Sequence, residues 1–173
     1  MMKPVFLIGF MGAGKTTYGR SLAQQTGLRF VDADDYLVER SGCSIPKLFS
    51  ERGEQGFRQW ERQCLEELCR MTDVVVATGG GMPCFFDNME LMRRSGLTIY
   101  LEASVEVLAR HLEGTGDRRP LLKGKTPEQL RGYIAATLEQ RRPFYELAAC
   151  RIDATRPDIV HLLGELVRYA PQD

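Results

Sequence analysis

The sequence has no excess of charge of one sign and no long hydrophobic run. Its 173 residues include 23 basic and 23 acidic side chains, so the formal net charge is zero. Balanced charge gives no electrostatic reason to expect a nucleic-acid or membrane partner. No apolar run approaches the length of about 20 residues that spans a bilayer. The apolar run Val5–Ile8 leads directly into Gly9 without a cleavage site, so we expect a first strand there and not a signal peptide.

Cysteine and histidine are too few and too scattered for a disulfide framework or a structural zinc site. The five cysteines are an odd number at irregular spacing, with no CxxC pair. Only His111 and His161 are present to complete a zinc ligand set. We therefore expect reduced thiols in a cytoplasmic protein.

The length and the order of the elements predict a single α/β domain. A chain of 173 residues is long enough for one compact domain and short for two, so residues 1–173 are taken as one unit. Short β-branched runs alternate with helical patterns, which predicts βαβ units and a parallel sheet with helices on both faces. The expected strands are Val5–Ile8, Phe30–Val31, Val74–Ala77, Leu97–Leu101 and Arg151–Ile152.

Three of the predicted helices bear on the site. The first runs from Lys15 to about Gln25, with Gly27 as its stop signal. The second has apolar residues at helical spacing: Phe57, Trp60, Cys64, Leu65 and Leu68. The third begins at Thr126, with proline in the first helical position and a capping-box glutamine. Its inner stripe contains Leu130, Ile134, Leu138, Arg141 and Tyr145.

The segment before the third helix, Glu113–Lys125, is different in composition. It has three glycines, four basic residues and few apolar ones. This composition predicts an exposed, mobile loop. Its arginines, Arg118 and Arg119, gain interest because phosphoryl transfer needs cations that arrive once the donor is bound.

The segment Gly9–Thr16 fits the phosphate-loop pattern G-x-x-x-x-G-K-[ST] between a predicted strand and a predicted helix. Glycines let successive backbone N–H groups turn toward phosphate oxygens, and the helix N-terminus adds its positive dipole. Lys15 is expected to reach the β- and γ-phosphates, and the Thr16 hydroxyl to coordinate Mg²⁺. The alternative, a chance glycine-rich turn, is disfavoured by this strand and helix context. The segment therefore predicts a nucleoside triphosphate used as phosphoryl donor.

Two aspartates after the second strand are candidates for the magnesium and acceptor sites. The strand Val74–Ala77 ends in Thr78 and three glycines, so it offers no carboxylate for magnesium. Asp32 and Asp34 are two residues apart on an extended chain and so point the same way. Asp32 is a candidate for binding the waters of Mg²⁺, and Asp34 for gripping or deprotonating a hydroxyl acceptor. The alternative is that both only cap the following helix, a role that Asp35 fits best.

Arginines occur where the pattern predicts burial. Arg141 is in register with the apolar stripe of its helix, and a buried guanidinium without a partner is costly, so it is expected to face a site or an anion. The alternative is a slip of one position, with Arg142 on the stripe and both side chains reaching solvent. Arg58 lies beside Phe57 near a helix start, where an arginine taken alone is more often a surface residue. Together, Arg58 and Arg141 are the right chemistry to hold an acceptor carboxylate.

These segments resemble the shikimate kinases, a family of the aromatic amino-acid pathway. The matching stretches are GFMGAGKTTYGR, FVDADDYLVERSGCSIPKLFSERGEQGFRQWE, ATGGGMP, RRPLL and RRPFYELA, in family order over nearly the whole chain. The triple glycine, the GFRxxE element and the RPLL lid are far more specific than the phosphate loop alone.

The resemblance implies a role for each candidate residue. The ATP phosphates would be bound by Gly12, Ala13, Gly14, Lys15, Thr16 and Thr17, with Thr16 on Mg²⁺ and Asp32 assisting through water. Shikimate would be bound by Asp34, Arg58, Gly79, Gly80, Gly81 and Arg141, the two arginines holding its carboxylate. Arg119 would be the lid arginine that reaches the phosphates, and Arg110 and Arg156 would pack around adenine. Lys15, Asp34 and Arg119 would be the catalytic residues.

The resemblance also implies a fold and an activity. These are a five-stranded parallel sheet in a three-layer P-loop kinase, with an acceptor region at about 34–61 and a lid at about 113–125, acting as a cytoplasmic monomer. The reaction would be ATP + shikimate → ADP + shikimate 3-phosphate. Two rivals remain: a kinase for gluconate or a nucleoside monophosphate, and a nucleotide-dependent switch. The switch is disfavoured because the only asparagine, Asn88, precedes Met89 and so cannot begin the Asn-Lys-x-Asp guanine loop.

Overall fold

The computed structural model describes residues 1–115, 122–156, 164 and 166. In these residues a five-stranded, all-parallel sheet has the strand order β2-β3-β1-β4-β5. The strands are β1 (Val5–Ile8), β2 (Arg29–Asp32), β3 (Val74–Ala77), β4 (Leu97–Glu102) and β5 (Cys150–Asp153). The predicted parallel α/β fold is therefore confirmed, and every predicted strand lies within one residue of its observed bounds.

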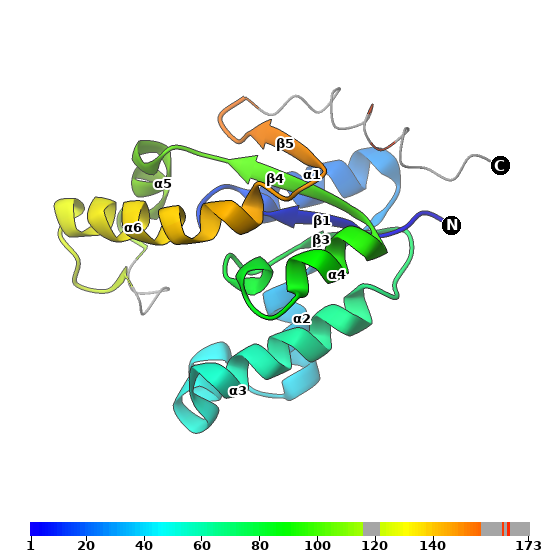
Figure 1. The fold of residues 1–173 in the computed structure, drawn as a ribbon, viewed down its shortest axis with the longest axis horizontal. Coiled ribbons are helices and arrows are strands. Elements are labelled where there is room, and N and C mark those ends of the chain that lie inside the picture. Colours follow the sequence, from blue (N-terminus) through cyan, green and yellow to red (C-terminus); the bar gives the residue numbers. More distant parts are fainter. Residues whose placement is uncertain (116–121, 157–163, 165, 167–173) are drawn as a thin grey trace.

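The helices enclose the sheet on both faces (Figure 1). They are α1 (Lys15–Thr26), α2 (Ala33–Ser41), α3 (Ile45–Leu68), α4 (Asn88–Ser95), α5 (Val105–Leu112) and α6 (Pro127–Tyr145), with a short 3₁₀ turn η1 (Met82–Cys84). Strands β1 and β3 are buried along their whole length, which is why both read as continuous apolar runs without alternation. None of the described helices combines the length and hydrophobicity needed to cross a membrane.

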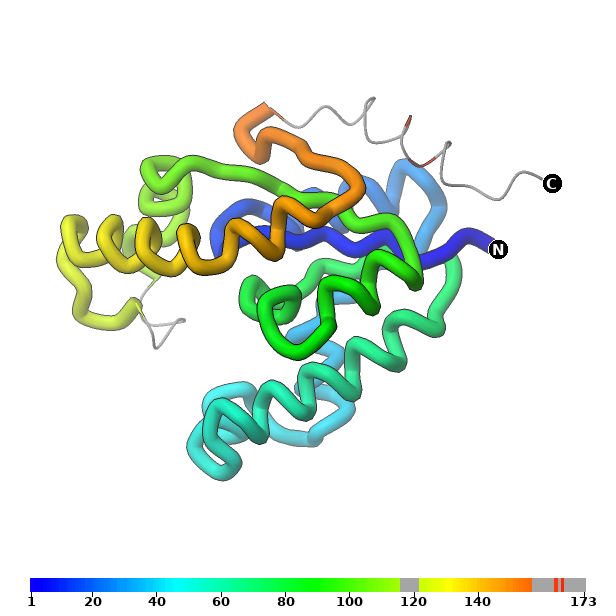
Figure 2. The backbone as a smooth tube through the Cα atoms, viewed as in Figure 1, coloured from blue at the N-terminus to red at the C-terminus, as the bar shows by residue number. Residues whose placement is uncertain are grey.

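Helices α2 and α3 form a second, smaller packing unit that projects from the sheet beside β2 (Figure 2). Its core is a separate cluster made of Leu37, Leu48, Phe57 and Cys64. Helix α3 is kinked at Gly53, whose φ of 65° and ψ of −176° are open only to glycine. The sequence pattern predicted only the part of α3 that follows this kink.

The C-terminal part of the described fold is built on α6. The capping box is present as predicted: the Thr126 hydroxyl accepts from the Gln129 N–H, and the Gln129 side chain accepts from the Thr126 N–H. Leu130, Ile134 and Tyr145 are buried, and helix α5 packs alongside α6. The predicted inner stripe of this helix is therefore the face that covers the core.

Because all the strands run in one direction, the segments that follow them meet at a single edge of the sheet. The phosphate loop follows β1, Asp32 ends β2 with Asp34 in the first turn of α2, and the triple glycine follows β3. Ligands of open parallel sheets bind at this carboxyl edge. The fold thus assembles three separate sequence motifs into one place.

Candidate active site

The segment Gly9–Thr16 curls between β1 and α1 as a phosphate loop. Three of its glycines have positive φ: Gly9 at 140°, Gly12 at 82° and Gly14 at 91°. At Gly9 space is limiting as well, because an added Cβ would lie 2.6 Å from the carbonyl oxygen of Leu101. The loop can therefore be built only with glycine at this position.

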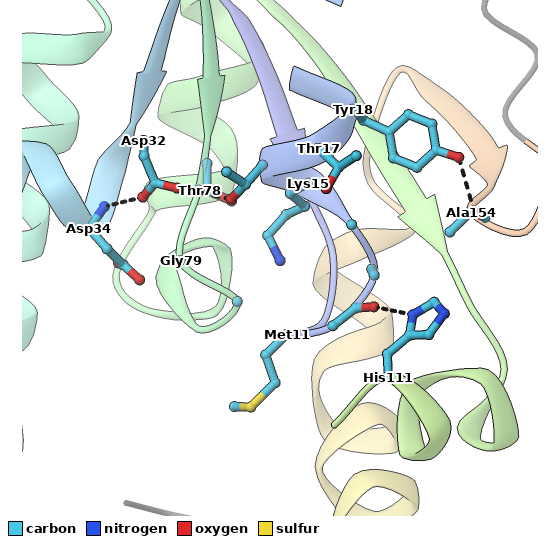
Figure 3. Close-up of a pocket in the computed structure, with 15 residues that line it drawn as sticks. Met11, Lys15, Thr17, Tyr18, Asp32, Asp34, Thr78, Gly79, His111 and Ala154 are labelled. Carbon is cyan, nitrogen blue, oxygen red and sulfur yellow. Dashed lines mark hydrogen bonds between the residues drawn. The ribbon is translucent and has the colours of Figure 1, made fainter. Parts of the chain in front are cut away.

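Lys15 lies inside this loop, with only 8% of its surface exposed. Its Nζ donates to the carbonyl oxygens of Gly9 at 2.8 Å and Phe10 at 2.9 Å. These bonds hold the ammonium group over the centre of the loop, where Figure 3 shows it pointing into the cavity. A cation in this position is suited to meet the terminal phosphates of a bound nucleotide.

Thr16 and Asp32 form an oxygen-rich pair beside the loop. The Thr16 hydroxyl donates to Oδ2 of Asp32 at 3.0 Å, and Oδ1 of Asp32 accepts the backbone N–H of Asp34 at 3.0 Å. Asp32 is thus the N-cap of α2 and a neighbour of Thr16 at once, so its capping role is confirmed and its role in binding the waters of Mg²⁺ stays a prediction. Hydroxyl and carboxylate oxygens are the ligands, direct or through water, that Mg²⁺ prefers.

A cavity of about 560 Å³ opens over the carboxyl edge of the sheet (Figure 3). It brings together the phosphate loop, both aspartates and part of the triple glycine. Its lining residues are Met11, Gly12, Ala13, Gly14, Lys15, Thr16, Thr17, Tyr18, Asp32, Asp34, Thr78, Gly79, Gly80, His111 and Ala154. A nucleotide on the loop would lie in the same cavity as the Asp34 carboxylate.

Each glycine of the turn Gly79–Gly81 lies against a different charged side chain. An added Cβ would be 3.0 Å from Oδ1 of Asp34 at Gly79, 3.3 Å from Nη1 of Arg141 at Gly80, and 2.8 Å from Nη1 of Arg58 at Gly81. Two guanidinium groups and one carboxylate therefore converge on this turn. The sequence placed all of these groups in one site, and the fold brings them together.

Arg58 is held almost completely inside the protein, with 12% of its side chain exposed. Its Nη1 donates to Oε2 of Glu61 at 2.8 Å, and its guanidinium carbon lies 3.9 Å from the centre of the Phe85 ring. Its Nε is buried and has no hydrogen-bond partner among the described residues. A buried donor without a partner is costly, so this guanidinium has capacity for a further acceptor.

Glu61 is a site residue to which the sequence assigned no role. It is 1% exposed, and burial raises the pKa of its carboxyl group while the neighbouring Arg58 opposes that rise. Asp34 and Arg141 also act on its ionisation, so all four groups lie in one electrostatic cluster. A signal was available, because Glu61 falls on the same helical stripe as Phe57 and Leu65.

Arg141 lies on the inner stripe of α6, half-buried, whereas Arg142 is exposed. The alternative of a one-residue slip is therefore wrong. The Arg141 guanidinium lies 5.6 Å from the ring of Phe10 in the phosphate loop. One turn further along α6, the Tyr145 hydroxyl donates to the carbonyl oxygen of Gly80 at 2.6 Å. Helix α6 thus positions both the arginine and the glycine turn beneath it.

The residues expected around adenine are less closely gathered. Arg110 lines a separate cavity of about 310 Å³ with Glu106 and Arg131, not the cavity over the phosphate loop. Arg156 is exposed and follows β5. Arg119 and the central part of the predicted lid, residues 116–121, lie outside the described residues, so that expectation stays a prediction.

Two residues that sequence reasoning did not assign line the cavity near β5. The Tyr18 hydroxyl donates to the carbonyl oxygen of Ala154 at 3.2 Å, and Nδ1 of His111 lies 2.7 Å from the carbonyl oxygen of Gly12 (Figure 3). No motif singles out either residue. Their place in the cavity follows only from the way α1, α5 and β5 pack.

The site combines a phosphate loop and its lysine with a hydroxyl–carboxylate pair. Two arginines and an aspartate lie next to it against the glycine turn. This arrangement is that of a P-loop kinase for a small hydroxylated anion. The comparisons agree. The family model for shikimate kinase matches residues 11–167. A shikimate kinase of Parabacteroides distasonis is 52% identical over 155 residues, which cover 90% of this chain and 90% of that protein. The chain belongs to the shikimate kinase family.

Solved structures extend the similarity to three dimensions. The crystal structure of shikimate kinase from Bacteroides thetaiotaomicron has a TM-score of 0.90 at 42% identity, covering 97% of this chain and 99% of that one. Shikimate kinase from Acinetobacter baumannii, solved in complex with shikimate, has a TM-score of 0.83 at 34% identity, covering 97% and 92%.

Proposed function

We propose that this chain transfers the γ-phosphoryl group of ATP to the 3-hydroxyl of shikimate, giving shikimate 3-phosphate and ADP in the chorismate pathway to aromatic amino acids. The observation that carries the proposal is the convergence of Arg58, Arg141 and Asp34 on the glycine turn beside the phosphate loop. Two cations and a carboxylate match an acceptor that has one carboxylate and a set of hydroxyl groups.

Acceptor recognition divides between the two kinds of charged group. Arg58 and Arg141 bind the carboxylate, and the unpartnered Nε of Arg58 gives it a donor to offer. Asp34 binds a hydroxyl at the opposite end of the acceptor, facing the cavity that holds the phosphate loop. Gly79, Gly80 and Gly81 allow the ring to approach the backbone closely. Glu61 keeps the Arg58 guanidinium in place through their 2.8 Å bond.

The reaction is an in-line displacement at phosphorus. The 3-hydroxyl oxygen forms a bond to the γ-phosphorus while the bond from that phosphorus to the β,γ-bridging oxygen breaks, and ADP leaves. The hydroxyl proton passes to the Asp34 carboxylate. Lys15 and the N–H groups of Gly12, Ala13, Gly14, Lys15, Thr16 and Thr17 stabilise the charge on the phosphates, so catalysis is mainly a matter of position and charge.

The donor set at Thr16 and Asp32 fits Mg²⁺. The Thr16 hydroxyl would hold the ion directly and Asp32 would hold its waters, as their 3.0 Å hydrogen bond beside the loop supports. The ion supplies positive charge to the β- and γ-phosphates when it is bound with ATP.

The domain boundaries, the lid, the adenine contacts and the oligomeric state are part of the same proposal. Residues 1–173 form one kinase domain, in which about 34–61 bind the acceptor and about 113–125 form a lid whose Arg119 reaches the phosphates. Arg110 and Arg156 pack around adenine. The enzyme acts as a monomer in the cytoplasm and has neither nucleic-acid nor membrane partners, a proposal supported by its balanced charge.

A coupled ADP-release assay tests the function. The enzyme is supplied with ATP and Mg²⁺ and with shikimate, gluconate or a nucleoside monophosphate in turn. We expect turnover with shikimate to exceed turnover with each rival by several orders of magnitude. Equal or better turnover with gluconate or a nucleotide would contradict the proposal.

A further inference from the structure

The end of α5 is attached to the phosphate loop by two contacts that the reaction above does not use. Nδ1 of His111 lies 2.7 Å from the carbonyl oxygen of Gly12 (Figure 3). A carbonyl oxygen can only accept, so the imidazole donates from Nδ1. The next residue, Leu112, packs on the same glycine: a Cβ added to Gly12 would lie 3.0 Å from its Cγ.

These contacts restrain a glycine-containing part of the loop. Gly12 and Gly14 both have positive φ, and glycine peptides reorient with little steric resistance. If the Gly12 carbonyl turned into the cavity, its oxygen would face the phosphate oxygens and repel them. The hydrogen bond from His111 holds that oxygen on the outer side of the loop.

We propose that His111 is a positioning residue for ATP: its Nδ1–H holds the Gly12 carbonyl away from the phosphates and ties the phosphate loop to the end of α5. This inference rests on the phosphate loop binding ATP, and it adds a residue that no motif identifies. His111 need not touch the reacting atoms to act in this way.

The same contacts give the loop a connection to the segment that follows α5. Both the backbone N–H and the hydroxyl of Thr115 donate to the carbonyl oxygen of Leu112, at 3.1 and 2.7 Å. A continuous set of contacts therefore runs from Gly12 through His111 and Leu112 to Thr115, at the start of the predicted lid. Nucleotide bound on the loop is expected to restrict α5 and the first lid residues together.

The tautomer of His111 is the first test. A neutral imidazole in water carries its proton mainly on Nε2, whereas this contact requires it on Nδ1. Long-range ¹H–¹⁵N spectra of the untagged protein at alkaline pH read the tautomer directly, and the variant His161→Gln assigns the two histidines. We expect His111 to be protonated on Nδ1. Protonation on Nε2 would overturn the proposal, whatever the acceptor of the kinase proves to be.

Kinetics of matched variants are the second test. His111→Phe keeps a ring and removes the donor, whereas His111→Asn places an amide N–H close to the position of Nδ1. We expect His111→Phe to raise the KM for ATP roughly three- to tenfold, the effect of one neutral hydrogen bond. The KM for shikimate and kcat should stay within about twofold of the wild-type values, because the lost hydrogen bond affects only ATP binding. His111→Asn should recover most of the loss.

Glu139→Gln is the control, because Glu139 is exposed on α6 and lies outside both the cavity over the loop and the cavity that contains Arg110. Equal losses in His111→Phe and His111→Asn, or a parallel rise in both KM values, would overturn the proposal. The affinity for ADP, measured by calorimetry on the same variants, reports nucleotide binding to the phosphate loop in the absence of any acceptor. It therefore separates failure of this proposal from failure of the proposed reaction.

Discussion

The two acceptor arginines are held in different ways, and their variants should differ accordingly. Arg58 is paired with the buried Glu61, so Arg58→Ala leaves an unpaired carboxylate inside the protein. Arg141 rests against the ring of Phe10, so its removal disturbs less of the surrounding structure. Loss of stability is therefore expected mainly for Arg58→Ala.

Both Arg58→Ala and Arg141→Ala should weaken acceptor interaction by about 1.5–3 kcal/mol, the range for a charge-assisted hydrogen bond, while ATP affinity hardly changes. Because the two side chains share one anion, the double variant should depart from the sum of the singles. Initial rates and calorimetric affinities measure this, with the exposed Arg142→Ala as matched control. A loss of ATP affinity with shikimate binding intact would show that the acceptor site is misplaced.

Asp34→Asn tests chemistry separately from binding. The amide keeps the size of the side chain and some hydrogen bonding, but it removes the group that accepts the hydroxyl proton. We expect kcat to fall by roughly 10²–10⁴, the usual contribution of general base catalysis. The KM for shikimate should change far less. Initial rates over a range of shikimate concentrations separate the two effects, and a large rise in KM with kcat unchanged would assign Asp34 to binding alone.

At the scale of elements, the kink in α3 separates the start of the helix from the part that contains Arg58. Gly53 divides the helix five residues before Arg58, in a backbone region that only glycine occupies readily. An added Cβ at Gly53 would meet no atom within 4 Å, so the cost of a side chain there is conformational and not steric. The part of α3 that follows the kink contains Arg58, whose guanidinium lies against Gly81 of the glycine turn.

Gly53→Ala should therefore lower the free energy of unfolding by about 1–3 kcal/mol, as backbone strain of this kind costs. Urea unfolding measures it, with Gly132→Ala as the control, because Gly132 lies within α6 and also has open space around its Cα. Alanine at Gly132 should stabilise the protein, since glycine inside a helix is unfavourable. Equal stability of the wild type and Gly53→Ala would show that α3 can straighten without cost.

The sequence predicted the elements with strong local signals. The phosphate loop has a fixed spacing, β1 and β3 are continuous apolar runs, and Arg141 stood out as a charge on an apolar stripe. Glu61 gives the same signal on α3, but its pairing with Arg58 becomes visible only in the folded structure. The kink at Gly53 and the His111 contact were beyond prediction, since both depend on how separate elements pack.

At the scale of the whole molecule, the predicted lid is the segment of the chain between α5 and α6. The segment 114–125 should exchange its amide hydrogens quickly in the free enzyme. When an unreactive ATP analogue and shikimate are both bound, exchange should slow, because closure excludes water and protects ATP from hydrolysis. Amides of β1 and β3, buried in the sheet, serve as the internal control. Unchanged exchange in 114–125 with both ligands bound would contradict closure.

The glycine turn after β3 also restricts how the enzyme can change under selection. Each of its three glycines lies against a different side chain of the proposed acceptor site, so a substitution that displaces an inhibitor would also displace Asp34, Arg141 or Arg58. Resistance to a compound seated on Gly79–Gly81 should therefore be slow to arise there. A saturation library of these codons, selected for kinase activity, should return glycine almost alone at Gly81, where the clearance is smallest. Frequent recovery of alanine or serine at that codon would show that Arg58 can move aside, so that resistance substitutions are possible at this position.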